Sequence, residues 1–152
     1  MTKKSMLKLD IVVPLYNDEE VVEKLCETVF STLENTFKAV RLIMIDDGSV
    51  DESYNLALRM RETYDGIEVI KLAGNFGQHR AILAGLRSTS ADLVAVMDSD
   101  LQDRPEHIPL LVERMLEDGT SLAIARRTRR ADTLRKRLFS RMFAATSNLL
   151  VP

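Results

Sequence analysis

The chain has 152 residues, enough for one domain with a sizeable core, and its 45% hydrophobic and 29% charged residues are ordinary for a globular protein. No apolar run approaches the roughly 18 residues that span a membrane, and the N-terminal run is too short to predict a signal peptide. The net charge of −2 hides an asymmetry, because residues 126–141 hold eight cations and one acid, a net +7 that leaves −9 on the rest.

Five short apolar runs, rich in valine and isoleucine, predict strands that are covered on both faces. Helical patterns alternate with these runs, so the sequence predicts an α/β fold with a mostly parallel sheet, right-handed crossovers and flanking helices. No internal repeat or low-complexity linker interrupts the alternation, which favours a single domain. In chain order, the predicted strands span residues 9–15, 40–46, 67–72, 92–98 and 121–126.

The helical patterns have recognisable ends. Ser49 and Glu52 have capping-box spacing and predict the start of the second helix. Pro105 is a favourable first residue for the fourth helix, and Gly119 is a favourable stop. Cys26 lies on the apolar stripe of the first helix, so we expect a reduced, partly buried thiol. The predicted helices span residues 18–35, 49 onward, 78 onward, 105–119 and 133–150.

Acidic residues follow the predicted strands where the strands end. Asp98 and Asp100 follow the fourth strand, and at about 7 Å apart in an extended segment they repel by about 2 kcal/mol at an effective dielectric constant of about 20. Parallel strands end at one edge of a sheet, so we expect the acids to converge there. A divalent ion shared with a substrate phosphate accounts for such a cluster, and a solvated acidic loop is the alternative. The acids expected at this edge are Asp18, Glu19, Asp46, Asp47, Asp98 and Asp100.

Single residues near this edge have competing interpretations. Of the two acids after the second strand, Asp47 is expected to face a ligand, whereas Asp103 is interpreted as a favourable charge at a helix start. Tyr16 is left open between a core aromatic and a ring that stacks on a base. His79 and His107 lack partners at ligand spacing, so zinc is not expected.

Four motifs together resemble those of the family 2 glycosyltransferases. In order they read VVPLYNDEE, LIMIDDGSVDES, GNFGQHRAILAGL and LVAVMDSDLQDRPEHIPLLVERM, and the resemblance covers roughly residues 9–143. The nearest subgroup is the polyprenyl-phosphate sugar transferases, such as dolichol-phosphate mannose synthases and the undecaprenyl-phosphate aminoarabinose transferases of the bacterial cell envelope. The resemblance implies the GT-A fold, a Rossmann-like nucleotide-diphospho-sugar transferase fold. It also implies inverting transfer of a hexosyl or pentosyl group from a UDP- or GDP-sugar to a polyprenyl phosphate.

The resemblance also implies roles for single residues. Mg²⁺ or Mn²⁺ is expected at Asp98, Asp100 and Gln102, against the diphosphate of the donor. Lys136 and Ser140 match positions near the acceptor phosphate. No catalytic residue is assigned, because relatives with hydroxyl acceptors carry the base in a later part of their chains. The nucleotide-sugar-binding residues implied are Pro14, Tyr16, Asp18, Glu19, Asp47, Asp98 and Arg126.

The basic block at residues 126–141 predicts an anionic partner. We expect it to contact the acceptor phosphate or the cytoplasmic face of a membrane as a peripheral protein, and a solvated basic helix face is the alternative. Nucleic acid is not expected as a partner, and a homo-oligomer is compatible with the sequence. Because relatives are longer, residues 1–152 are expected to form one incomplete nucleotide-sugar-binding domain without the acceptor side, weakly active or inactive alone.

Two other functions stay open. One is a non-catalytic nucleotide-binding or interaction remnant. The other is a phosphatase of the haloacid-dehalogenase type, which also carries Asp-x-Asp after a strand. In such a phosphatase the first aspartate attacks phosphorus and normally follows the first strand, whereas here the pair follows the fourth.

Overall fold

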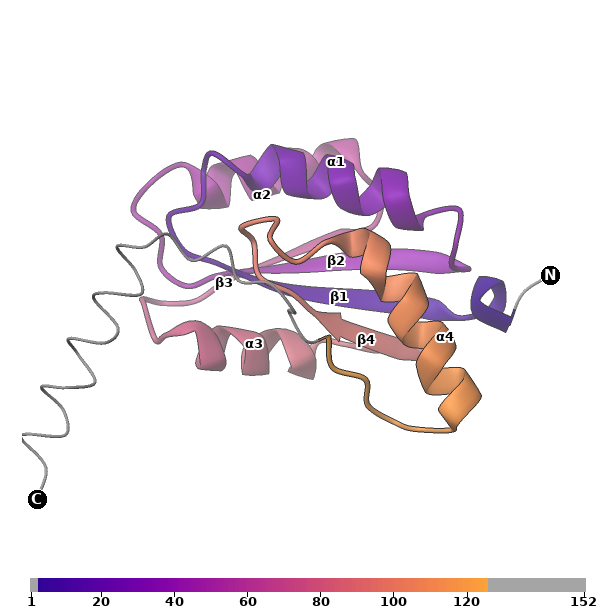
Figure 1. Ribbon diagram of the computed structural model, residues 1–152. Coiled ribbons are helices and arrows are strands. Elements are labelled where there is room, and N and C mark those ends of the chain that lie inside the picture. Colours follow the sequence, from indigo (N-terminus) through magenta and orange to yellow (C-terminus); the bar gives the residue numbers. More distant parts are fainter. Residues whose placement is uncertain (1–2, 126–152) are drawn as a thin grey trace, which may run out of the picture.

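Four parallel strands form the centre of the structure, a computed structural model that describes residues 3–125 (Figure 1). The strand order is β3-β2-β1-β4. The strands are β1 (Lys8–Leu15), β2 (Ala39–Asp46), β3 (Ile67–Lys71) and β4 (Leu93–Val96). The helices are α1 (Val22–Leu33), α2 (Ser53–Thr63), α3 (Gln78–Arg87) and α4 (Ile108–Asp118), with 3-10 helices η1 (Lys3–Met6) and η2 (Pro105–His107).

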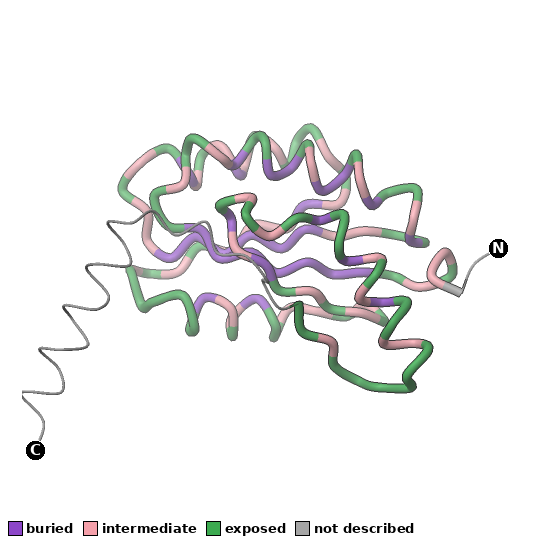
Figure 2. The backbone as a smooth tube through the Cα atoms, in the orientation of Figure 1, coloured by how far each residue is buried: buried purple, intermediate pink, exposed green. Residues whose placement is uncertain are grey.

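The two faces of the sheet are covered by different helices (Figure 1). Ile11 and Val13 of β1 belong to the larger core with α1, α2 and α4, whereas Val12 packs beneath α3. Purple, buried backbone accordingly concentrates in the central strands (Figure 2). Most of β1 and β2 is buried on both faces, as the sequence predicted. For β4 that prediction is wrong, because Val94 and Val96 are 44% and 48% exposed. Cys26 lies in the larger core, and burial raises the pKa of its thiol to about 12.

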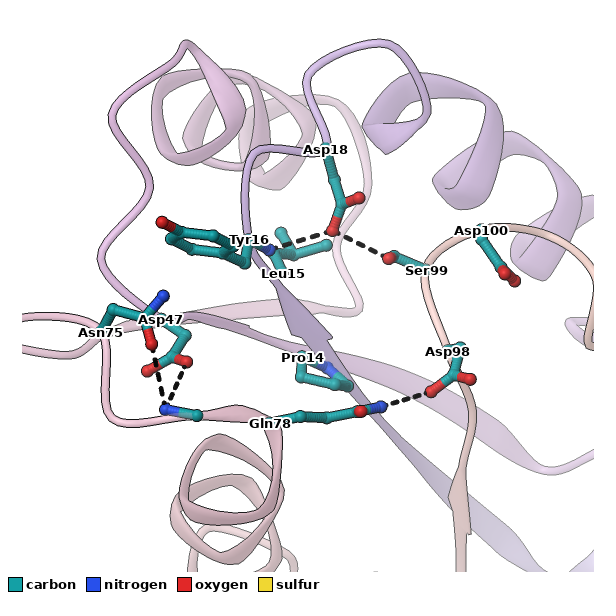
Figure 3. A pocket seen from close by; sticks show the side chains of 11 residues that line it. Pro14, Leu15, Tyr16, Asp18, Asp47, Asn75, Gln78, Asp98, Ser99 and Asp100 are labelled. Carbon is teal, nitrogen blue, oxygen red and sulfur yellow. Dashed lines mark hydrogen bonds between the residues drawn. The ribbon is translucent and has the colours of Figure 1, made fainter. Parts of the chain in front are cut away.

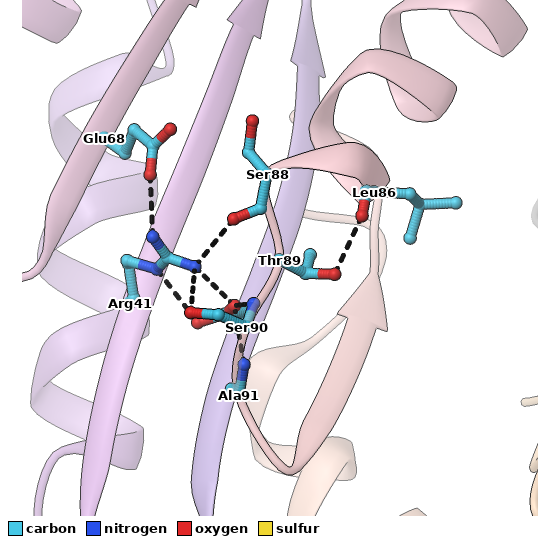
Figure 4. Close-up of polar contacts among 8 residues, drawn as sticks. Arg41, Glu68, Leu86, Ser88, Thr89, Ser90 and Ala91 are labelled. Carbon is cyan, nitrogen blue, oxygen red and sulfur yellow. Dashed lines mark hydrogen bonds and ion pairs between the residues drawn. The ribbon is translucent and has the colours of Figure 1, made fainter.

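An ion-pair cluster joins the amino ends of the strands to the α3–β4 connection (Figure 4). The Arg41 guanidinium donates to Asp10 at 2.6 and 3.0 Å and to Glu68 at 2.8 Å. The Asp10 carboxylate also accepts the backbone N–H groups of Ser90 and Ala91. Burial raises the pKa of Asp10, but the hydrogen bonds from Arg41 and from the two N–H groups outweigh it, so the pKa lies below its ordinary value. The hydrogen bond to Asp10 raises the pKa of Arg41.

Four of the five predicted strands are confirmed, and the fifth is wrong over residues 121–125, which form no strand. Leu122 and Ile124 of that run are 73% and 79% exposed. Within residues 3–125, β4 pairs with β1 alone and has no neighbour on its outer edge. An apolar run becomes a strand only where a neighbouring strand pairs with it and a layer covers it, and within residues 3–125 the run at 121–125 has neither.

Two predicted helix starts are corrected by the structure. The first helix was expected from residue 18 but begins at Val22, because the preceding residues form a turn. The capping box at Ser49 is also wrong, since the Ser49 hydroxyl accepts the N–H of Asn17 instead. The second helix begins at Ser53, whose N–H donates to the Asp51 carboxylate at 3.0 Å. The polar side chains of this region therefore connect two loops.

Candidate functional site

A pocket of about 340 Å³ lies at the carboxyl ends of the strands, where loops that follow all four strands meet (Figure 3). Its volume falls within the range of roughly 300–1,000 Å³ that is usual for small-molecule sites. Four of the six acids expected at this edge line the pocket, whereas Glu19 does not and Asp46 is fully buried. The binding role of each residue stays a prediction. Six of the residues assigned from sequence line the pocket, namely Pro14, Tyr16, Asp18, Asp47, Asp98 and Asp100.

Asp47 is 3% exposed and anchors the loop between β3 and α3. Its two carboxylate oxygens accept the N–H groups of Phe76 at 2.7 Å and Gly77 at 2.8 Å. Gly48 lets the β2–α2 loop approach this segment, because its φ is +75° and an added Cβ would lie 2.6 Å from the nitrogen of Asn75. Asp47 thus shapes the pocket wall, and its contact with a base or ribose stays a prediction.

Tyr16 lies on the pocket rim and is 47% exposed, so its interpretation as a core aromatic is wrong. The loop around it is held by Asp18, whose Oδ2 accepts the N–H of Tyr16 at 2.9 Å and the hydroxyl of Ser99 at 2.8 Å. Glu19 is not brought to the pocket. Its carboxylate accepts the N–H of Glu52 at 2.9 Å, at the start of α2.

The segment after β4 presents Asp98 and Asp100 to the pocket (Figure 3). Oδ1 of Asp98 accepts the side-chain amide of Gln78 at 2.6 Å, and Oδ1 of Asp100 accepts the N–H of Gln102 at 3.0 Å. The side chain of Gln102 does not line the pocket. Asp103, interpreted from sequence as a helix-start acid, folds back so that its Oδ2 accepts the N–H of Asp98 at 3.4 Å.

The donor atoms of the pocket suit a metal ion that is shared with a phosphate. Among residues 3–125, no group of three or more His, Cys, Asp or Glu side chains is arranged to hold an ion alone. Asp98 and Asp100 offer carboxylate oxygens, and Mg²⁺ in phosphate-binding enzymes usually takes one or two carboxylates and completes its shell with phosphates and water. The pair therefore fits a divalent ion that arrives with a phosphate-bearing ligand.

Some site residues were missed by sequence reasoning, and others fall outside the described part of the chain. Gln78 and Ser99 line the pocket and contact its acids, but neither received a role from the sequence. The available signals were the placement of Gln78 at a helix start after a strand end and that of Ser99 between two acids. Arg126, Lys136 and Ser140 lie outside the described residues.

The fold and the pocket define a class of protein: an α/β domain of the GT-A type, with paired aspartates at the carboxyl edge of a parallel sheet. The chain belongs to glycosyl transferase family 2, whose family model matches residues 10–149. This membership confirms the family predicted from the motifs and decides against the phosphatase alternative.

The chain is similar to curated transferases of bacteria. It is 35% identical over 146 residues to the undecaprenyl-phosphate 4-deoxy-4-formamido-L-arabinose transferase of Photorhabdus laumondii, a match that covers 95% of this chain and 45% of that protein. It is 37% identical over 130 residues to the transferase of the same name from Salmonella choleraesuis, covering 85% of this chain and 40% of that protein. The chain thus spans less than half the length of these relatives.

Solved structures with low sequence identity share the fold. A mannosyltransferase from Pyrobaculum calidifontis, in complex with GDP-mannose and Mn²⁺, matches with a TM-score of 0.64 and 17% identity, over 72% of this chain and 32% of that one. A glucosyl-3-phosphoglycerate synthase from Mycobacterium tuberculosis, in complex with Mn²⁺, UDP and glucosyl-3-phosphoglycerate, matches with a TM-score of 0.57 and 24% identity, over 72% of this chain and 40% of that one. At these identities the likeness establishes the fold alone.

Proposed function

We propose that the chain is the nucleotide-sugar-binding part of a glycosyltransferase that moves a sugar from a UDP- or GDP-sugar to a polyprenyl phosphate. The observation that carries the proposal is the convergence of Asp18, Asp47, Asp98 and Asp100 on one pocket at the carboxyl edge of the sheet. The names of the curated relatives support the polyprenyl-phosphate acceptor. The nucleotide and Mn²⁺ bound to the two fold neighbours support the donor and the metal ion.

In this proposal, different pocket residues contact different parts of the donor. Asp98 and Asp100 would hold Mg²⁺ or Mn²⁺, and the bound ion would supply positive charge against the diphosphate of the donor. The amino end of α3 opens onto the pocket at Gly77 and Gln78, and its partial positive charge favours a phosphate. Tyr16 offers an exposed ring for stacking on the base. A polyprenyl phosphate is already an anionic nucleophile, so the transfer needs no strong general base.

A thermal-shift series with UDP, GDP and ADP, each with and without Mn²⁺, tests donor binding. A ligand that binds only the native state at about 100 times its dissociation constant stabilises the protein by about 2.7 kcal/mol. We expect UDP or GDP to raise the melting temperature, with a further rise when Mn²⁺ is present. Asp100→Asn removes an anionic ligand of the ion, so it is expected to abolish the Mn²⁺-dependent part of the shift and keep the metal-independent part.

The matched control is Asp65→Asn, which changes the same functional group at an exposed turn before the amino end of β3, whereas the pocket lies at the carboxyl ends of the strands. It should leave both parts of the shift as they are in the wild type. Retention of the whole Mn²⁺-dependent shift by Asp100→Asn would show that the metal assignment is wrong. The non-catalytic alternative predicts nucleotide binding without lipid-linked sugar when labelled UDP- or GDP-sugars and undecaprenyl phosphate are added.

We also propose that the protein contacts the cytoplasmic face of a membrane peripherally, through residues 126–141. The net +7 of this block supports contact with anionic lipid or with the acceptor phosphate. Within residues 3–125, no helix is long and apolar enough to cross a bilayer. The homo-oligomer stays a prediction from the sequence.

A further inference from the structure

We propose that Gln78 and Ser99 are positioning residues that hold the Asp98–Asp100 segment in the orientation that binds a divalent ion. The inference rests on the proposed function and deepens it, because it assigns part of the ion affinity to two residues that act through neighbouring carboxylates. Neither residue offers a carboxylate of its own. Their contribution is the geometry in which Asp98 and Asp100 meet a ligand.

The sheet gives the Asp98–Asp100 segment little support. It follows β4, which has four residues and, within the described part of the chain, pairs with β1 alone. The segment then continues into Leu101, whose φ of +58° is in the left-handed region that residues with a Cβ rarely adopt. A short edge strand followed by a disfavoured backbone conformation keeps one geometry only if other contacts fix it.

Two side-chain hydrogen bonds provide such contacts from opposite sides of the pocket (Figure 3). From α3, the Gln78 amide donates to Oδ1 of Asp98 at 2.6 Å. From the segment itself, the Ser99 hydroxyl donates to Oδ2 of Asp18 at 2.8 Å, and Ser99 is only 8% exposed. Asp18 is in turn fixed, because its N–H donates to the Ser53 hydroxyl at 2.7 Å. The segment is thereby tied both to a helix start and to the loop after β1.

These contacts leave oxygens available for an ion. Gln78 engages Oδ1 of Asp98, and the Oδ2 atoms of Asp98 and Asp100 accept no hydrogen bond from residues 3–125. Gln78 is a neutral donor, so it orients the carboxylate without cancelling its charge as a lysine or arginine would. Loss of an outer hydrogen bond that orients a metal-binding carboxylate typically weakens metal affinity about 10- to 100-fold.

The test is direct Mn²⁺ binding to the full 152-residue chain, measured by the electron paramagnetic resonance signal of free Mn²⁺ in the presence of UDP or GDP. We expect Gln78→Leu and Ser99→Ala each to weaken Mn²⁺ binding about 10-fold or more. Gln78→Asn, which keeps the amide on a shorter side chain, should lose most of the same affinity. Gln78 is exposed, so its variants should fold and melt like the wild type without ligand.

The controls are His79→Leu, at the next residue of α3, which is also exposed, and Ser31→Ala, which removes a hydroxyl from an exposed position of α1. Both should bind Mn²⁺ as the wild type does. Wild-type Mn²⁺ affinity in Gln78→Leu and Ser99→Ala, or equal losses in the controls, would overturn the positioning role and leave the proposed function standing. Absence of Mn²⁺ binding by the wild type with either nucleotide would overturn both, so the two failures are distinguishable.

Discussion

Outside the pocket, the charged form of the buried Asp10 is stabilised by several hydrogen bonds. Asp10 is 2% exposed, and its carboxylate accepts hydrogen bonds from Arg41 and from two backbone N–H groups. Because the pKa of Asp10 is lowered in the folded state, its charged form stabilises the protein above the unfolded pKa of about 3.9, and this contribution disappears as the pH falls through the folded pKa. We therefore predict that Asp10→Asn lowers the free energy of unfolding by about 2 kcal/mol at neutral pH. Urea unfolding over a pH series should show the difference from wild type shrinking below about pH 4. Asp65→Asn, at an exposed turn, should have the same free energy of unfolding as the wild type at every pH. If the difference between Asp10→Asn and the wild type stays constant at acidic pH, the role assigned to Asp10 is wrong.

At the scale of elements, α3 depends on a close approach to the sheet at Gly85. A Cβ added there would lie 2.5 Å from Cδ1 of Ile45 and 2.6 Å from Cγ1 of Val12, both in the buried strands. Gly85→Ala gains about 1 kcal/mol of helix propensity, but overpacking a well-filled core typically costs about 1–3 kcal/mol. We predict a net loss of about 1 kcal/mol in chemical unfolding, with a displaced α3 that also weakens nucleotide binding. Gly74→Ala is the control, because within residues 3–125 no atom beyond its own chain neighbours lies within 4 Å of its added Cβ, and it should be neutral or slightly stabilising. Stabilisation by Gly85→Ala equal to that of Gly74→Ala would show that the helix has room to move.

The elements also show which parts of the fold the sequence determines locally. Helix ends with a local cause were predicted well, such as the stop at Gly119, which adopts the left-handed conformation with φ +63°. The start of α2 was misplaced, because Ser49 bonds Asn17, a residue distant in sequence that no local pattern reveals. The run at 121–125 failed for a related reason, since an apolar segment needs a partner strand.

At the scale of the whole molecule, the position of the site was predictable although its internal contacts were not. Parallel topology forces the ends of β1, β2 and β4 to one edge, so the acids that follow them had to meet. The contacts from Gln78 to Asp98 and from Ser99 to Asp18 depend on how the loops pack in three dimensions. The spacing of residues along the chain does not predict that packing.

The uneven distribution of charge along the chain leads us to predict how it binds anionic membranes. Residues 126–141 carry a net +7 while the remainder carries −9, so orientation toward an anionic surface depends on one block. Each cation near such a surface contributes about 1 kcal/mol, so replacing the four arginines at 126, 127, 129 and 130 with glutamine should weaken binding to phosphatidylglycerol vesicles about 100-fold or more. Vesicle co-sedimentation measures this, and wild-type binding should fall as salt shortens the screening length to about 10 Å at about 0.1 M. Replacing four exposed arginines of α2 and α3 (Arg59, Arg61, Arg80 and Arg87) makes the same change in net charge outside the block and should have a much smaller effect. Equal losses in the two quadruple variants would mean that net charge alone, and not the basic block, governs the contact.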